Sequence, residues 1–144
     1  MVRVTDLSTL PTFDDISAAS SRIADGIFHT PCFEAPALSE RCGCTVFTKD
    51  EHLQRTGSFK ERGARNALLL LSQDAKQRGA VAASAGNHAL ALAHHGRELG
   101  IPITVCMPIH APLVKQRRCE LLGAKVIRCG EHILEARQTA DELA

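Results

Sequence analysis

Two short segments of the sequence contain groups that could take part in covalent chemistry or anion binding. The first holds Lys60, which follows Gly57 closely and stands beside the apolar Phe59. A free lysine amine has a pKa of about 10.4 and is a poor nucleophile near neutral pH. Burial against apolar groups lowers that pKa and lets the amine form a Schiff base with an aldehyde. The alternative is an ordinary solvent-exposed lysine at the start of a helix.

The second segment is Ser84-Ala85-Gly86-Asn87-His88, which follows a β-like stretch and precedes a helical one. Its small residues let the backbone approach a ligand closely. The N–H groups of a first helical turn have no partners within the helix, so they can bind an anion. Ser84 and Asn87 add polar side chains at the same place. The alternative is that one of these two residues is an ordinary N-cap.

The elements that must position these segments follow from an alternation of strand-like and helical patterns. Strands are predicted at 80–83, 103–107 and 125–129, with helices between them at 87–99 and 112–122. Each of the two helices ends at a glycine just before the next strand. This alternation implies right-handed crossovers and a parallel sheet, with ligands beyond the carboxyl ends of the strands. The predicted fold class is α/β, an open parallel sheet with helices on both faces.

Further elements are predicted outside this sheet. Helical periodicity covers residues 12–26, 58–78 and 131–144, and residues 45–49 have strand character. The 58–78 segment has a sustained apolar face, and Gly79 is a plausible stop. Lys60 is therefore expected near the start of a long helix.

The composition excludes several classes of protein. The chain has 144 residues, of which 44% are hydrophobic and 23% charged, and its net charge is +1. These values suit a globular domain without a bias toward nucleic acid, and the absence of Trp and Tyr argues against base stacking. No run approaches the roughly 20 apolar residues that span a bilayer. The first residues lack a secretion-signal pattern, so no membrane partner and a cytoplasmic location are predicted.

Cysteines and histidines do not predict a metal site. The six cysteines are spread through apolar segments, which indicates reduced thiols that pack in the interior. Cys42 and Cys44 have the wrong spacing for a zinc knuckle, and no second Cys/His pair follows at a suitable distance. His88, His94 and His95 are interpreted as capping and surface residues, because i,i+1 neighbours do not share a helix face.

The segment around Lys60 resembles the lysine motif of the serine/threonine dehydratases, or threonine ammonia-lyases. These enzymes depend on pyridoxal 5'-phosphate (PLP) and have the tryptophan synthase β-like fold. The matching residues are Thr56-Gly57-Ser58-Phe59-Lys60-Glu61-Arg62-Gly63-Ala64. The resemblance extends to the K-x-E-x-x-Q of Lys49, Glu51 and Gln54, to the asparagine loop at 84–88, and to the M-P-x-x-A-P-x-x-K at 107–115. It covers residues from about Pro31 to Gly130.

This resemblance implies roles for the matching residues. Lys60 would be the Schiff-base lysine and the base that removes the substrate Cα proton, and Phe59 would pack on the cofactor. Asn87 would bond the hydroxyl of the pyridine ring. Ser84, with the backbone N–H groups of Ala85, Gly86, Asn87 and His88, would hold the substrate carboxylate. The implied reaction is dehydration and deamination of a small-molecule hydroxy-amino acid, L-threonine or L-serine, to a 2-oxo acid and ammonia.

The sequence also departs from the family pattern. Leu90 stands where relatives often have glutamine, and Ala85 stands where the racemases of the family have a second acid/base serine. The latter favours elimination over racemisation. The family's glycine-rich phosphate loop is missing, because none of the ten glycines is adjacent to another.

Family members are more than twice this long, so the chain is interpreted as an N-terminal portion. Residues 1–52 would form an N-terminal arm and the opening of the large domain. Residues 53–144 would form the PLP-lysine helix and most of the small α/β domain, with the rest of the large domain absent. The full-length form is expected to be a homo-oligomer.

Two alternatives to a catalytic chain remain at this point. The chain could be a truncated, non-catalytic α/β module of the same family that needs a missing C-terminal portion or a partner. It could also be a Rossmann-like nucleotide binder, although the missing G-x-G-x-x-G argues against that interpretation.

Overall fold

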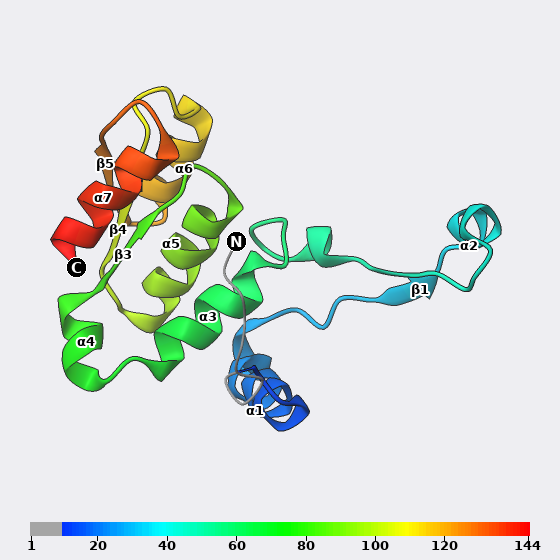
Figure 1. Ribbon diagram of the computed structural model, residues 1–144. Helices are drawn as coiled ribbons and strands as arrows, with labels where there is room; N and C mark the ends of the chain where they lie inside the picture. Colours follow the sequence, from blue (N-terminus) through cyan, green and yellow to red (C-terminus); the bar gives the residue numbers. More distant parts are fainter. Residues whose placement is uncertain (1–9) are drawn as a thin grey trace.

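The centre of the molecule is a three-stranded parallel sheet (Figure 1). The computed structural model describes residues 10–144; residues 1–9, which belong to the expected 1–52 arm, lie outside the described residues. The strand order is β3 (Ala80–Ala83), β4 (Ile103–Met107) and β5 (Lys125–Arg128). Each strand pairs in parallel with its neighbour, and Ala80 lies opposite Ile103.

Helices cover both faces of this sheet. The helix α5 (Asn87–Leu99) connects β3 to β4, α6 (Leu113–Leu121) connects β4 to β5, and α7 (Ile133–Leu143) follows β5. In Figure 1, α5 and α7 lie on opposite sides of the strands. The predicted α/β fold with a parallel sheet and helices on both faces is confirmed.

The alternation of side chains along β4 explains how one strand serves two cores. Ile103, Val105 and Met107 are buried on the α5 side, in the larger apolar cluster. Cys106 is buried on the other side, against the alanines of α7. Successive residues of a strand point to opposite faces, so a strand covered on both sides is apolar throughout.

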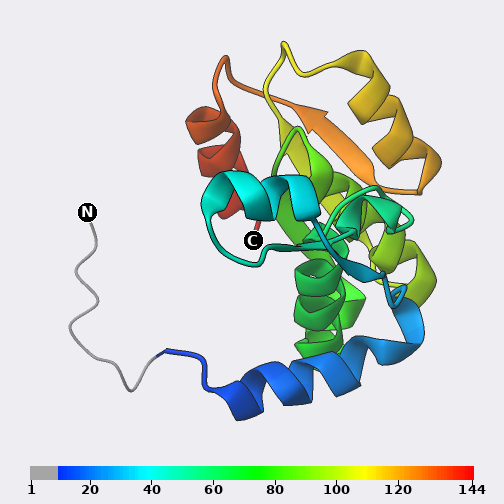
Figure 2. The same cartoon turned by 90° about the vertical axis from the view of Figure 1, so that its right-hand side faces the viewer.

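Two further helices extend the α5 side of the molecule. The helix α3 (Lys60–Leu70) packs on α5 through the buried Ala64 and Leu68. The helix α1 (Phe13–Ile23) continues into the 3₁₀ turn η2 (Ala24–Gly26) and contacts α3. Figure 2 shows α1 running crosswise below α3. This packing fixes the start of α3, where Lys60 lies.

A two-stranded arm extends away from this body (Figure 1). The strands β1 (Cys32–Glu34) and β2 (Phe47–Lys49) pair in antiparallel fashion. Between them lies α2 (Pro36–Cys42), which ends at Gly43 with a φ of +67°. The sequence patterns predicted the strand near 45–49 but neither β1 nor α2. The 3₁₀ turn η3 (Glu51–Leu53) leads from the arm back to the body.

The prediction of one continuous helix over 58–78 is wrong. The helix α3 ends at Leu70, and Leu71 is extended with φ −62° and ψ 141°. A second helix, α4 (Gln73–Arg78), begins after Ser72, whose hydroxyl accepts a hydrogen bond from the Ala75 N–H at 3.2 Å. Serine competes well for the orphan N–H groups of a helix start, and this explains the break without any glycine or proline.

Candidate cofactor site

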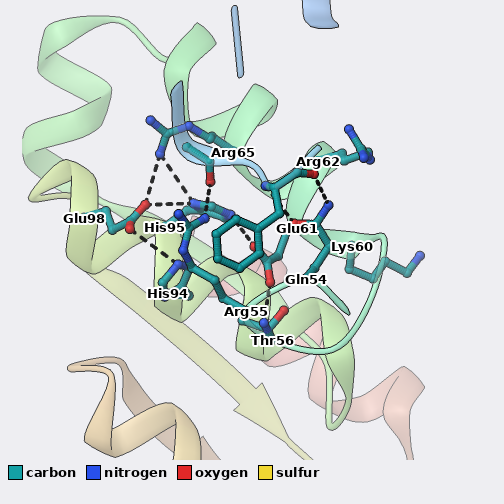
Figure 3. A network of polar contacts seen from close by, with 12 residues as sticks. Gln54, Arg55, Thr56, Lys60, Glu61, Arg62, Arg65, His94, His95 and Glu98 are labelled. Carbon is teal, nitrogen blue, oxygen red and sulfur yellow. Dashed lines mark hydrogen bonds and ion pairs between the residues drawn. The ribbon is translucent and has the colours of Figure 1, made fainter. Parts of the chain in front are cut away.

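Lys60 is the first residue of α3, and its side chain is exposed. Its amine lies 4.8 Å from the centroid of the Phe59 ring, which is itself 59% exposed. Figure 3 shows the Lys60 side chain directed away from the polar residues behind it. Residues 10–144 therefore do not form the apolar pocket that was expected around this amine.

The 84–88 loop lies at the carboxyl end of β3, as the fold class predicts. The Ser84 N–H donates to the Cys106 carbonyl at 3.1 Å, so the strand ladder continues into the loop. The Ser84 hydroxyl oxygen accepts hydrogen bonds from the N–H groups of Gly86 and Ala89, both at 3.3 Å. The N-cap residue of α5 is Gly86, which has no side-chain cap, so the interpretation of Ser84 or Asn87 as an ordinary N-cap is wrong. Ser84 instead bonds the first turn from two residues before the N-cap.

The two hydrogen bonds to Ser84 leave other backbone N–H groups of the loop available. Asn87 and His88 are the first two residues of α5, and backbone N–H groups at these positions have no acceptor within a helix. Asn87 is exposed, and its side-chain oxygen accepts a hydrogen bond from the Lys115 amine at 3.4 Å. Free N–H groups at the positive end of a 13-residue helix can bind an anion.

The positive charge of Lys60 affects a residue of the 84–88 loop. Partial burial of the His88 ring, followed by the positive charge of Lys60, lowers the pKa of His88, although the residue as a whole is exposed. The effect of Lys60 on His88 requires the two side chains to lie within electrostatic range. The charge of Lys60 therefore acts on His88, the last residue of the loop, while the amine itself is exposed.

The segment that leads to Lys60 is held by the K-x-E-x-x-Q residues. Gln54 is 4% exposed, and its side-chain amide bonds both the N–H and the carbonyl of Phe28, at 3.1 and 2.9 Å. The amine of Lys49 donates to the backbone carbonyl and to the hydroxyl of Thr30, the latter at 2.6 Å. These bonds join the end of the arm to the turn before α3.

Glu51 provides the strongest contact in this group. Its carboxylate accepts two hydrogen bonds from Arg62, at 2.8 and 2.6 Å, and one from the Thr30 hydroxyl at 2.6 Å. The paired guanidinium of Arg62 is the main reason why the pKa of Glu51 falls to about 2. Arg62 lies one helical position beyond Glu61, so this ion pair fixes the first turn of α3 to the η3 turn.

A second polar cluster lies behind Lys60 and was not predicted (Figure 3). Glu61 and His95 are fully buried, and Arg65 is 5% exposed. The interpretation of His95 as a surface residue is therefore wrong, and its ring lies edge-on to that of His94 with centroids 4.8 Å apart. The spacing of Glu61, Arg65 and Leu68 on one helix face was a signal that these charges point toward the core.

The cysteines also differ in part from their prediction. Cys106 and Cys119 are buried, and this burial raises the pKa of both thiols. The prediction that all six pack in the interior is wrong for three of them, which are exposed: Cys32, Cys42 and Cys44. All six are free thiols.

The residues present fit a cofactor with an aldehyde, a ring hydroxyl and an anionic group. The Lys60 amine has no hydrogen-bond acceptor within residues 10–144, so it is free to bond an aldehyde. Asn87, the first residue of α5, is exposed, and its amide hydrogens have no acceptor within residues 10–144. A free lysine at a helix start and a donor-rich loop at the carboxyl end of a parallel strand are the features expected of an α/β protein of the PLP-binding class.

Comparison with known proteins agrees with this class. The model of the family described as "Pyridoxal-phosphate dependent enzyme" matches residues 23–144. The chain belongs to this family, whose cofactor is PLP.

Curated relatives carry ammonia-lyase names. The chain is 37% identical over 135 residues to the L-threo-3-hydroxyaspartate ammonia-lyase of Saccharomyces cerevisiae, covering 94% of this chain and 41% of that protein. It is 43% identical over 129 residues to the L-threonine ammonia-lyase of Thermotoga maritima, covering 90% of this chain and 32% of that protein. The chain thus spans about two-fifths or less of the length of these relatives.

Solved structures show the same fold with two kinds of name. Serine racemase from Dictyostelium discoideum superposes with a TM-score of 0.83 at 34% identity, over 92% of this chain and 43% of that one. Threonine deaminase isoform 2 from Solanum lycopersicum superposes with a TM-score of 0.79 at 33% identity, over 92% of this chain and 38% of that one. Similarity of fold therefore does not separate racemase from lyase.

Proposed function

We propose that the chain is the lysine-bearing part of a PLP-dependent ammonia-lyase that converts L-threonine or L-serine to a 2-oxo acid and ammonia. The observation that carries the proposal is the position of Lys60 as the first residue of α3, with a free amine whose charge acts on His88 at the start of α5. In this proposal residues 1–52 form the arm and the opening of a large domain. Residues 53–144 form the lysine helix and most of a small domain.

Each proposed role rests on a group that the structure leaves available. The Lys60 amine would hold the cofactor and, once freed by the substrate, accept the Cα proton at Nζ. Bound there, PLP would withdraw electrons from the substrate Cα. The Asn87 amide would bond the ring hydroxyl, and the exposed Phe59 would pack on the ring.

The carboxylate of the substrate would bind at the start of α5. The Ser84 oxygen already accepts two N–H groups, so its own hydroxyl hydrogen is free to be donated. The N–H groups of Asn87 and His88 point outward from the first turn and add two more donors. Gly86 has no side chain and Ala85 has only a methyl group, so neither would block the anion. Together these donors would hold the Cα–H bond in line with the Lys60 amine.

Ala85 supports elimination rather than racemisation. Racemisation requires one group to take the Cα proton and a second group to return a proton from the opposite face. The methyl group of Ala85 cannot donate or accept a proton. With Lys60 as the acid/base, the β-hydroxyl would leave after the Cα proton, and hydrolysis would release the 2-oxo acid and ammonia.

The attachment site can be tested by trapping. The chain is incubated with PLP, reduced with borohydride, digested and analysed by mass spectrometry, while absorbance is followed against the low background of a protein without Trp or Tyr. We expect the adduct on Lys60 and at least a tenfold loss of adduct in Lys60→Ala. Lys125→Ala, which removes another exposed lysine, is the matched control and should keep the adduct.

A second candidate, the non-catalytic module, is favoured by the exposure of Lys60 and Phe59. It predicts that the label spreads evenly over Lys60, Lys76, Lys115 and Lys125, and that outcome would refute selective attachment. The reaction type is tested on the full-length protein with L-serine. We expect pyruvate, the 2-oxo acid of serine, whereas D-serine without pyruvate would refute the lyase assignment.

A further inference from the structure

Three side chains of the buried polar cluster converge behind the start of α3. Glu61 comes from α3, and His94 and His95 come from the C-terminal half of α5. One carboxylate oxygen and one ring nitrogen from each histidine lie within 4.8 Å of one another. The side chains of Glu61 and His95 are 0% exposed and that of His94 is 16% exposed. None of these groups has a role in the proposed ammonia-lyase reaction.

The atoms that face one another in this cluster lack hydrogen bonds. Glu61 Oε1 accepts the Thr56 N–H, which fixes the carboxylate. Its other oxygen, Oε2, lies 3.5 Å from His95 Nε2, and neither atom has a hydrogen-bond partner within residues 10–144. His94 Nε2 is also buried without a hydrogen bond in that part of the chain, although Glu98 Oε1 lies 3.5 Å from it. Buried polar atoms nearly always have a partner, so three unpaired atoms together need an explanation.

The other nitrogen of His95 suggests how the ring is oriented. His95 Nδ1 lies 3.3 Å from Glu98 Oε2, so a hydrogen on Nδ1 can be donated to that carboxylate. The lone pair of Nε2 then faces the Glu61 carboxylate. Histidines that bind metals usually donate their second N–H to a carboxylate in this way. The competing arrangement has Arg65, 3.5 Å from Nδ1, donating to that nitrogen, with a hydrogen on Nε2.

The charges around the cluster leave an excess of negative charge. Arg65 is the cation at its centre, bonded to Asp25 at 2.9 Å and to Glu98 at 3.2 Å. Together with Glu61 these are three carboxylates around one guanidinium. Arg62, on the same helix, is paired with Glu51. Water solvates Asp25 and Glu98, whose side chains are 78% and 38% exposed, so Glu61 is the fully buried carboxylate whose charge a bound cation would compensate.

We propose that Glu61 Oε2, His94 Nε2 and His95 Nε2 bind a divalent transition-metal ion of the zinc type. Two imidazoles and one carboxylate form a common ligand set with an open fourth position. Bonds of about 2.0–2.1 Å in a tetrahedron put ligand atoms about 3.3–3.4 Å apart. Glu61 Oε2 and His95 Nε2 are already 3.5 Å apart, and the three ligand atoms lie within 4.8 Å, so the partly exposed His94 ring would move toward the other two on binding. The ion would join α3 to α5.

A pocket provides the route to this site. A cavity of about 220 Å³ is lined by Thr56 and His94, together with Arg55, Arg118, Leu121 and Leu122. It gives water access to the His94 side of the cluster, where a water molecule would take the fourth position. Thr56 Oγ1, which is buried and has no hydrogen-bond partner within residues 10–144, is available to bond that water.

The test is a metal titration of the 144-residue chain. The exposed thiols are first removed by Cys32→Ser, Cys42→Ser and Cys44→Ser, and the protein is stripped with a chelator. We expect one Zn²⁺ per chain, a raised Tm with Zn²⁺, and a Co²⁺ spectrum with nitrogen and oxygen ligands but no thiolate band.

Variants locate the ion. Glu61→Gln should lower Zn²⁺ affinity by about 100-fold or more. Glu98→Gln, which changes the carboxylate that faces Arg65 and both histidines, should lower it by about 10- to 100-fold. His110→Gln is the matched control, because His110 and Glu131 form an exposed histidine–carboxylate pair at 2.9 Å. Its affinity should equal that of the parent chain. His94→Gln provides a partly exposed ligand change if Glu61→Gln does not fold.

Three results would overturn the proposal. The first is no Zn²⁺ binding to the parent chain, and the second is binding that Glu61→Gln and His94→Gln leave unchanged. The third is a Glu61→Gln variant whose Tm is higher than that of the parent chain, with Zn²⁺ changing the Tm of neither protein. That third result would favour the metal-free arrangement, in which His95 Nε2 carries a hydrogen toward Glu61.

Discussion

Replacement of Glu51 by glutamine tests how the structure holds the segment before Lys60. The substitution keeps the shape of the side chain and removes its charge. In the structure this carboxylate is 15% exposed and accepts two hydrogen bonds from Arg62 and one from Thr30. Glu51→Gln removes the ion pair and leaves the Arg62 guanidinium without its partner.

The size of the effect follows from the pKa of Glu51. The Arg62 guanidinium is the main cause that lowers this pKa from its ordinary value of 4.5 to about 2. Such a fall corresponds to about 3 kcal/mol of folding free energy, because a shift of one pKa unit is worth about 1.4 kcal/mol. The Arg62 side chain is 35% exposed, so water screens the pair. We therefore expect a loss of about 2 kcal/mol in the free energy of unfolding at pH 7.

The lowered pKa of Glu51 also predicts how the free energy of unfolding changes with pH. A carboxyl whose pKa is lowered by folding stabilises the protein fully above its unfolded pKa of 4.5. That stabilisation is lost as the pH falls from 4.5 toward about 2. Wild type and Glu51→Gln should therefore differ by about 2 kcal/mol at pH 7 and converge over this interval.

Urea unfolding followed by circular dichroism measures this difference, since the chain has no Trp or Tyr for fluorescence. Glu142→Gln, at an exposed carboxylate of α7, is the control and should unfold like wild type at every pH. A Glu51→Gln deficit that stays constant from pH 7 to acid, or no deficit at pH 7, would refute the assignment of the stabilisation to this ion pair.

Further predictions concern packing and thiols. Gly96→Ala should destabilise by about 1–3 kcal/mol in thermal unfolding, because its Cβ would lie 2.2 Å from Ile103 Cγ1 and 2.9 Å from the Ile101 carbonyl oxygen. Gly63→Ala, where nothing lies within 4 Å, should stabilise by about 0.5–1 kcal/mol; effects of equal sign would contradict this contrast. A thiol reagent should label the exposed cysteines in the native protein and the buried, less acidic thiols only after unfolding. Equal rates would contradict the burial of two cysteines, Cys106 and Cys119.

The sheet could be predicted because several local signals agree there. The strands at 80–83 and 103–107 and the helix at 87–99 have the bounds that the patterns indicated. Apolar strands alternate with helices, and Gly100 adopts a φ of +67° at the expected helix end. The parallel sheet then places the 84–88 loop at the carboxyl end of β3 without any knowledge of tertiary contacts.

Other features could not be predicted because their signals are short or ambiguous. The strand β1 has three residues, too few to show an alternation, and the helix α2 has only seven. The break at Ser72 depends on a side-chain cap rather than on glycine or proline. The spacing of Glu61 and Arg65 on the apolar face of α3 was the one signal of their burial, but charged residues are rarely buried without a partner, and the sequence did not show that partner. Their role became visible only when α5 brought His95 against them.

For Lys60 itself, sequence and structure agree only in part. The motif predicted its place at the start of a helix, and the structure has Lys60 as the first residue of α3. The motif could not predict whether this part of the chain encloses the amine. Enclosure depends on what lies over Lys60 and Phe59, and no local pattern records that.

One straight helix carries a proposed site at each end. At about 1.5 Å per residue, the 13 residues of α5 span about 20 Å. The anion-binding loop lies at its N-terminus, and His94, His95 and Glu98 lie on its last two turns. Because a buried helix moves as a rigid rod, a shift of its far end by metal loss or by repacking would tilt the donors at its near end. The orientation of the bound substrate would then depend on whether the proposed metal site is occupied, although the substrate does not contact that site.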